Sequence, residues 1–108
     1  MSDDNQIIST YTRSQALNDG TLINISETAK TVGYKYPMAI TSTLAADLTG
    51  HSAVFWTLYR FAKLIAETPQ EGNDLIVLKD VEGGEAWLHL GPGDNGEPVL
   101  TLMRPQDW

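Results

Sequence analysis

The sequence predicts an α+β domain in which short N-terminal helices and one long core helix pack on a C-terminal three-stranded antiparallel meander. Its 108 residues are enough for one domain. Apolar residues follow the helical period over His51–Glu67, and three later segments change to the two-residue period of strands. We therefore expect a single domain over residues 11–108, after a mainly polar and flexible lead-in at residues 1–10.

Composition and charge exclude several classes of protein. Hydrophobic residues make up 42% of the chain and charged residues 19%, which is typical of a folded domain. The net charge of −7 argues against a surface that binds nucleic acid, and no apolar run approaches the roughly 20 residues of a membrane helix. The acidic N-terminus is unlike a signal peptide, so we expect a cytoplasmic protein. The absence of cysteine excludes disulfides and thiolate metal sites.

The first predicted helix covers residues 12–19. Thr12 and Gln15 have the spacing of a capping box, in which each side chain bonds the backbone N–H of the other residue. Gly20 can adopt the left-handed conformation that ends a helix. These signals predict about two helical turns.

Three short segments follow. Residues 21–25 are rich in β-branched side chains and predict a strand that adds to one edge of the sheet. Residues 26–33 predict a second short helix that a glycine closes. Residues 41–48 predict a third helix with a threonine cap, after an apolar segment at residues 38–40.

The strongest helical pattern runs over His51–Glu67. Its polar residues Thr57, Arg60, Lys63 and Glu67 are three or four positions apart and fall in one stripe. Nearly every other position of this segment is apolar. So narrow a polar stripe predicts a helix that is buried on most of its circumference and forms the centre of the core.

The three strands of the meander are predicted at Leu75–Val81, residues 86–90 and Pro98–Met103. The first turn, at residues 82–85, contains paired glycines that can adopt positive φ. The second connection, residues 91–97, is a longer glycine-rich loop. Proline is permitted at the start of the third strand.

No motif predicts catalysis, a cofactor or a metal site. The loop at residues 91–97 matches GxGxxG, but a strand follows it where a dinucleotide site requires a helix. We interpret it as a hairpin connector. His51 and His89 do not have the spacing of metal ligands. Asp94 and Glu97, at the tip of the loop, are expected to be solvated.

One strand carries a candidate contact site. Ala86, Leu88 and Leu90 share one face, so Trp87 and His89 lie on the other. If the aliphatic face meets the long helix, Trp87 and His89 face solvent, and tryptophan is enriched at protein interfaces. Alternatively, the N-terminal helices cover this face and make Trp87 part of a second core layer. Both alternatives stay open.

Three segments together resemble a known family. They are residues 11–25 (YTRSQALNDGTLINI), 37–41 (PMAIT) and 91–101 (GPGDNGEPVLT). The combination resembles a domain-of-unknown-function family carried by bacterial plasmids, integrative elements and phages. Ala45 departs from that pattern, because a tryptophan is common there in the family. The resemblance implies an accessory protein of a mobile element in a bacterial cytoplasm, without a known activity to carry over.

We therefore predict a small, acidic, non-enzymatic interaction protein that binds a host or element-encoded protein partner, with inhibition of host defence as one hypothesis. The candidate partner-binding residues are Trp87, His89, Asp94, Glu97, Tyr11 and Arg13. The alternative is a small-molecule-binding domain or small enzyme that uses Tyr11, Arg13 and the Asp94 to Glu97 region. A concave pocket that holds Arg13 together with carboxylates of perturbed pKa would favour this alternative, whereas a flat apolar patch around Trp87 would favour protein binding.

Overall fold

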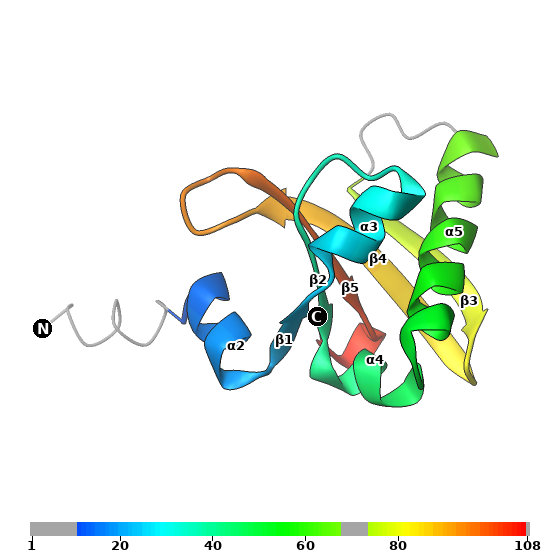
Figure 1. The fold of residues 1–108 in the computed structure, drawn as a ribbon, viewed down its shortest axis with the longest axis horizontal. Coiled ribbons are helices and arrows are strands. Elements are labelled where there is room, and N and C mark those ends of the chain that lie inside the picture. The colour runs from blue at the N-terminus through cyan, green and yellow to red at the C-terminus, as the bar shows by residue number, and fades with distance from the viewer. Residues whose placement is uncertain (1–10, 68–73, 108) are drawn as a thin grey trace, which may run out of the picture.

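The computed structural model describes residues 11–67 and 74–107, which form one mixed sheet with helices on both of its faces (Figure 1). The expectations for residues 1–10 and for the loop at 68–73 lie outside the described residues. The elements are, in chain order, α2 (Arg13–Asp19), β1 (Leu22–Asn24), α3 (Ser26–Val32), β2 (Met38–Thr41), α4 (Ser42–Asp47), α5 (His51–Glu67), β3 (Leu75–Val81), β4 (Gly84–Pro92), β5 (Pro98–Met103) and the 3₁₀ turn η1 (Pro105–Asp107).

The α+β class is confirmed, but the sheet is larger than predicted. Its five strands have the order β1-β2-β5-β4-β3. The last three strands pair antiparallel as consecutive neighbours, and β2 pairs parallel with β5. The sheet is therefore not the three-stranded antiparallel meander that was predicted, although the three predicted strands pair antiparallel as neighbours within it. The strand at the start of the chain, β1, does lie at an edge, antiparallel to β2.

The strand that the sequence did not predict is β2. All four of its residues are buried, and Met38 and Ile40 lie directly opposite Leu100 and Leu102 of β5. A strand buried on both faces is apolar at successive positions and shows no alternation. Four such residues carry too little pattern to distinguish a strand from the approach to a helix.

The short helix α2 begins and ends as its sequence predicts. The Thr12 hydroxyl accepts a hydrogen bond from the Gln15 N–H at 3.0 Å, and the Gln15 side chain accepts one from the Thr12 N–H at 2.8 Å. Gly20 closes the helix at φ 86°. The capping box is confirmed.

The core lies between the sheet and the helices α3 and α5, which cover the same face (Figure 1). Leu58 and Phe61 of α5 are fully buried. The expectation that α5 is buried on most of its circumference is wrong, because Trp56 is 59% exposed and Tyr59 48% exposed. Thr57, which was predicted to be in the polar stripe, is buried instead, and its hydroxyl donates to the Ala53 carbonyl oxygen at 2.8 Å.

The turn between β3 and β4 differs by one residue from the prediction. Glu82 and Gly83 have the two positive φ values, 49° and 87°, and Gly84 already belongs to β4. Two successive positive φ values are typical of a type I′ hairpin turn. The hairpin of β4 and β5 is also longer than predicted, since the pairing continues to Pro92 and Pro98.

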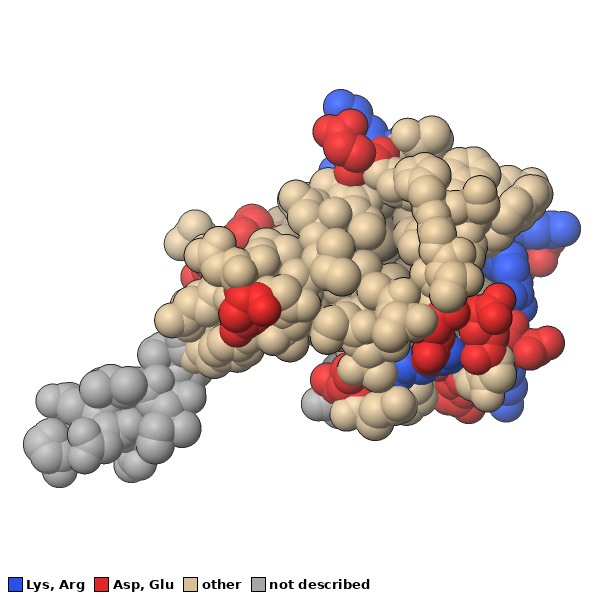
Figure 2. Space-filling view, turned by 60° about the horizontal axis from the view of Figure 1, so that its bottom comes forward, with Lys and Arg blue, Asp and Glu red and all other residues tan. Residues whose placement is uncertain are grey.

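Charged side chains do not form a single-sign surface on the face that Figure 2 shows. Basic residues lie next to acidic residues at the top and right of this view, acidic residues lie without a basic neighbour on the left, and most of the area between them carries neither (Figure 2). This arrangement limits long-range electrostatic attraction of a polyanion.

Candidate functional site

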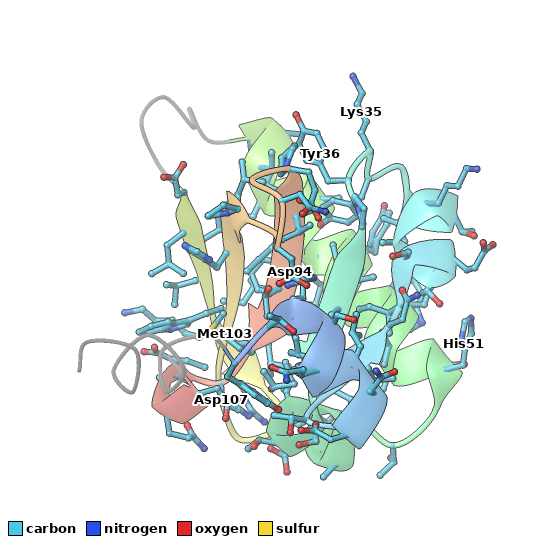
Figure 3. The ribbon with its side chains drawn as sticks, turned by 90° about the vertical axis from the view of Figure 1, so that its left-hand side faces the viewer. Lys35, Tyr36, His51, Asp94, Met103 and Asp107 are labelled. Carbon is cyan, nitrogen blue, oxygen red and sulfur yellow. The ribbon has the colours of Figure 1, made fainter. Side chains whose placement is uncertain are left out.

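Two of the predicted site residues, Arg13 and Asp94, come together at the start of α2. The Asp94 carboxylate accepts hydrogen bonds from the backbone N–H groups of Arg13 at 2.8 Å and Ser14 at 3.0 Å, across about 80 residues of sequence. These N–H groups have no partner within a helix, and a carboxylate there also interacts favourably with the helix dipole. Figure 3 shows Asp94 beside this end of α2. Asp94 therefore anchors the loop between β4 and β5 to α2.

The Arg13 side chain is held against the sheet. Its Nη1 donates to the Thr101 hydroxyl at 2.8 Å and its Nη2 donates to the Leu100 carbonyl oxygen at 2.8 Å. Burial lowers the pKa of Arg13, and the nearby carboxylates of Asp94 and Glu97 oppose that change. These contacts fasten α2 to β5.

Glu97 lies within the same loop and shapes it. Its carboxylate accepts a hydrogen bond from the Asn95 N–H at 2.9 Å, and it covers Gly93 so closely that a Cβ at Gly93 would collide with it. A side chain at position 93 would therefore require the flexible Glu97 side chain to move, and the Gly93 backbone N–H donates to the Glu97 carbonyl oxygen at 2.6 Å.

Tyr11 interacts with the other end of α2. Its hydroxyl donates to the Asp19 carboxylate at 2.6 Å and lies 3.2 Å from the Thr21 hydroxyl. The hydrogen bond to Asp19 raises the pKa of Tyr11 and lowers that of Asp19. Tyr11 and Arg13 also line a hollow of about 300 Å³ between α2 and η1, so the concave pocket holding Arg13 is present. The hydrogen bonds of Arg13 nevertheless attach α2 to the sheet, and those of Asp94 attach the loop to α2.

Trp87 and His89 lie on the sheet face opposite α5, as their alternation predicts. They are directly across from Met103 and Thr101 of β5, and both are partly buried. The Trp87 Nε1 donates to the Glu85 carboxylate at 3.0 Å. Trp87 is therefore neither fully exposed nor fully buried. His89 of β4 lies directly across from Thr101 of β5, whose hydroxyl accepts a hydrogen bond from Arg13.

The structure reveals an aromatic patch on α5, formed by the exposed Trp56 and Tyr59 and the partly buried Phe55. The Trp56 ring packs edge-on against both others, with centroid distances of 6.1 Å to Phe55 and 5.5 Å to Tyr59. Sequence reasoning placed these aromatic residues in the core. A signal was available, because Trp56 lies about 160° around the helix from Leu58 at 3.6 residues per turn.

Sequence reasoning also missed a buried arginine. Arg104 is 5% exposed, and its Nη2 lies 2.9 Å from the Asp47 carboxylate. Its guanidinium also donates to the carbonyl oxygens of Glu85 at 2.8 Å and Glu82 at 3.2 Å. These bonds tie the β3–β4 turn to α4. Arg104 therefore stabilises the fold.

An apolar cavity of about 400 Å³ lies where α3, α5 and the sheet separate at one end. The cavity wall includes Tyr34, whose hydroxyl donates to the Leu58 carbonyl oxygen at 2.9 Å, and burial raises the pKa of Tyr34. This cavity does not include any of the predicted site residues.

The part of the chain that the structure describes contains no group of three or more acidic or histidine side chains arranged to hold a metal ion. Within the same residues, each helix is too short or too polar to cross a membrane. Comparison of the chain with family models, with curated proteins and with solved structures finds no match.

Proposed function

We propose that this chain is a small, acidic, non-enzymatic protein of a mobile genetic element that acts by binding a protein partner through the aromatic patch of α5. The observation that carries the proposal is the exposure of Trp56 and Tyr59, at 59% and 48%, on the longest helix of the described chain. Large aromatic side chains are the residue type most enriched in the energetic centres of protein interfaces.

Burial of these side chains supplies a driving force. Trp56 and Tyr59 would each remove apolar area from water on docking, which is worth a few kcal/mol at about 25 cal/mol per Å². Both rings are also ordered by edge-on packing, so less conformational entropy is lost when a partner covers them.

The charges around the patch define the partner's chemistry. Arg60 and Lys63 are exposed on the same helix, four positions after Trp56 and Tyr59, and such positions are neighbours on a helix surface. The Arg60 Nη1 donates to the Asp80 carbonyl oxygen at 2.8 Å, which holds its side chain against β3. The partner surface that fits is an apolar groove bordered by carboxylates.

The biological setting rests on the sequence resemblance to the mobile-element family. In that setting, the partner is a host or element-encoded protein of the bacterial cytoplasm, and inhibition of host defence is the role we propose. Trp87 and His89 lie on the opposite face and are candidates for a second contact. The structural hydrogen bonds of Arg13 and Asp94 favour the interaction protein over the enzyme alternative.

Affinity capture from a bacterial host tests this proposal. The bait is the full chain, compared with the double variant Trp56→Ala/Tyr59→Ala and with the control Leu17→Ala/Ile23→Ala, which removes exposed apolar side chains elsewhere. We expect a protein that the wild type and the control retain and the patch variant loses. Equal retention by all three would contradict the proposal.

Analytical ultracentrifugation of the purified chain shows whether the aromatic patch binds a second copy of the chain and not a different protein. We expect a monomer, with or without the patch substitutions. A dimer that dissociates in Trp56→Ala/Tyr59→Ala would show that the patch binds a second copy of the chain, and would overturn the proposal.

A further inference from the structure

The apolar cavity extends into the core. Its floor is formed by Leu88 and Leu100, which are 2% and 8% exposed, and its sides by Ile65, Ile76 and Leu90. Its volume of about 400 Å³ lies within the range of roughly 300–1,000 Å³ that is typical of small-molecule sites. A single apolar side chain from a protein would leave much of this space empty.

The polar groups at this cavity have unequal roles. The Tyr34 hydroxyl is bonded to Leu58, so the ring is fixed in the wall. Lys35 also borders the cavity, but Figure 3 shows its side chain projecting away from the body of the molecule. Asp74 is exposed at the border, and its carboxylate makes no hydrogen bond or ion pair with another described residue. Asp74 is therefore the charged group available to a ligand.

We propose that this cavity binds a small ligand with an apolar body and one cationic amine. The body packs against Ile76, Leu90 and Leu100, and the amine pairs with the Asp74 carboxylate. The rings of Tyr34 and Tyr36 border the same cavity, and tyrosine rings attract cations. The net charge of −7 raises the local concentration of cations around the protein. This inference does not rest on the proposed protein partner.

The test uses two probes that share an apolar body and differ in charge. Tryptamine and indole-3-propionate are titrated at neutral pH into the isotopically labelled full chain, and the backbone amide signals are followed by NMR. We expect saturable binding of tryptamine, about tenfold tighter than that of indole-3-propionate, because one charge pairs with Asp74 and the other is repelled. The shifted signals should include Ala62 and Ile76.

Substitutions then locate the site and the charge. Asp74→Asn should reduce the preference for tryptamine to about twofold or less, whereas the control Asp80→Asn should keep it, because Asp80 is an exposed acid of β3 that does not border the cavity. Ala62→Trp and Leu90→Trp each place a large side chain in the cavity and should abolish binding. Trp56→Ala/Tyr59→Ala should bind tryptamine normally, which separates this site from the aromatic patch.

Several outcomes would overturn the proposal. These are no binding of tryptamine at millimolar concentration, equal or tighter binding of indole-3-propionate, and unchanged tryptamine binding in both folded tryptophan variants. If neither tryptophan variant folds, the proposal is tested by comparing wild type with Asp74→Asn. If both prefer tryptamine over indole-3-propionate to the same degree, Asp74 does not bind the amine and the proposal is overturned.

Discussion

Asp94 and Thr12 divide the capping of α2 between them. The Thr12 hydroxyl accepts from the Gln15 N–H within the same turn. The Asp94 carboxylate accepts from the Arg13 and Ser14 N–H groups and lies in the distant loop between β4 and β5. The sequence predicted the contribution of Thr12, because a capping box is a local motif. It could not predict the contribution of Asp94, because nothing in a single sequence indicates which of two distant segments meet in space.

We expect Asp94→Ala to lower the free energy of unfolding by about 1 kcal/mol, since it removes the acceptor for two N–H groups of α2. Asp94→Asn keeps one oxygen acceptor and should lose about half as much. Urea unfolding followed by circular dichroism measures both. Asp80→Ala is the control. If Asp94→Ala unfolds at the same urea concentration as the control, Asp94 does not cap α2.

The Tyr11 hydroxyl should control the titration of Asp19. Its hydrogen bond lowers the pKa of Asp19, so this contact stabilises the fold at neutral pH and is lost as the pH falls through the lowered pKa. Tyr11→Phe should raise the pKa of Asp19 toward its usual value. NMR titration of the carboxyl carbon measures this pKa. An unchanged pKa in Tyr11→Phe would show that the hydrogen bond is not formed in solution.

At the scale of elements, the sequence predicted where helices occur better than which face each buries. The bounds of α5 match the predicted helix, because seventeen residues with helical spacing give a strong pattern. Its exposed face was misassigned, because aromatic residues were counted as core whatever their angle around the helix. The strand β2 was missed because four apolar residues have no period of their own.

Truncation to alanine should destabilise the fold strongly at Leu58 of α5 and hardly at all at Trp56, two positions earlier. Leu58 is 0% exposed, so Leu58→Ala should lower the free energy of unfolding by about 2–5 kcal/mol. Trp56 is 59% exposed, so Trp56→Ala should change it by no more than about 0.5 kcal/mol. Chemical denaturation measures both variants. A larger loss for Trp56→Ala than for Leu58→Ala would reverse the assignment of the buried face.

At the scale of the whole molecule, the mixed sheet brings together parts of the chain that the sequence treats separately. The parallel pairing of β2 with β5 joins the N-terminal half to the C-terminal hairpins. That pairing also puts α2 within reach of the loop that carries Asp94. Arg13 and Asp94 therefore meet at a junction that holds the fold together, while the exposed side chains of Trp56 and Tyr59 lie on α5.

The charge of the whole chain predicts no detectable binding to duplex DNA at physiological salt. Acidic residues outnumber basic residues by fourteen to seven, and three of the basic residues, Arg13, Arg60 and Arg104, are held in hydrogen bonds to the protein itself. Electrophoretic mobility with micromolar protein tests this. A shift that weakens as salt rises would indicate a phosphate-binding surface.

The most direct test of the account is calorimetric titration of the purified partner against single variants of the chain. We expect Trp56→Ala to weaken binding by at least about thirtyfold, which is the loss typical of a central interface residue, and Leu17→Ala to change it by about twofold or less. Full affinity in Trp56→Ala, with the partner still bound, would show that the chain acts through another surface.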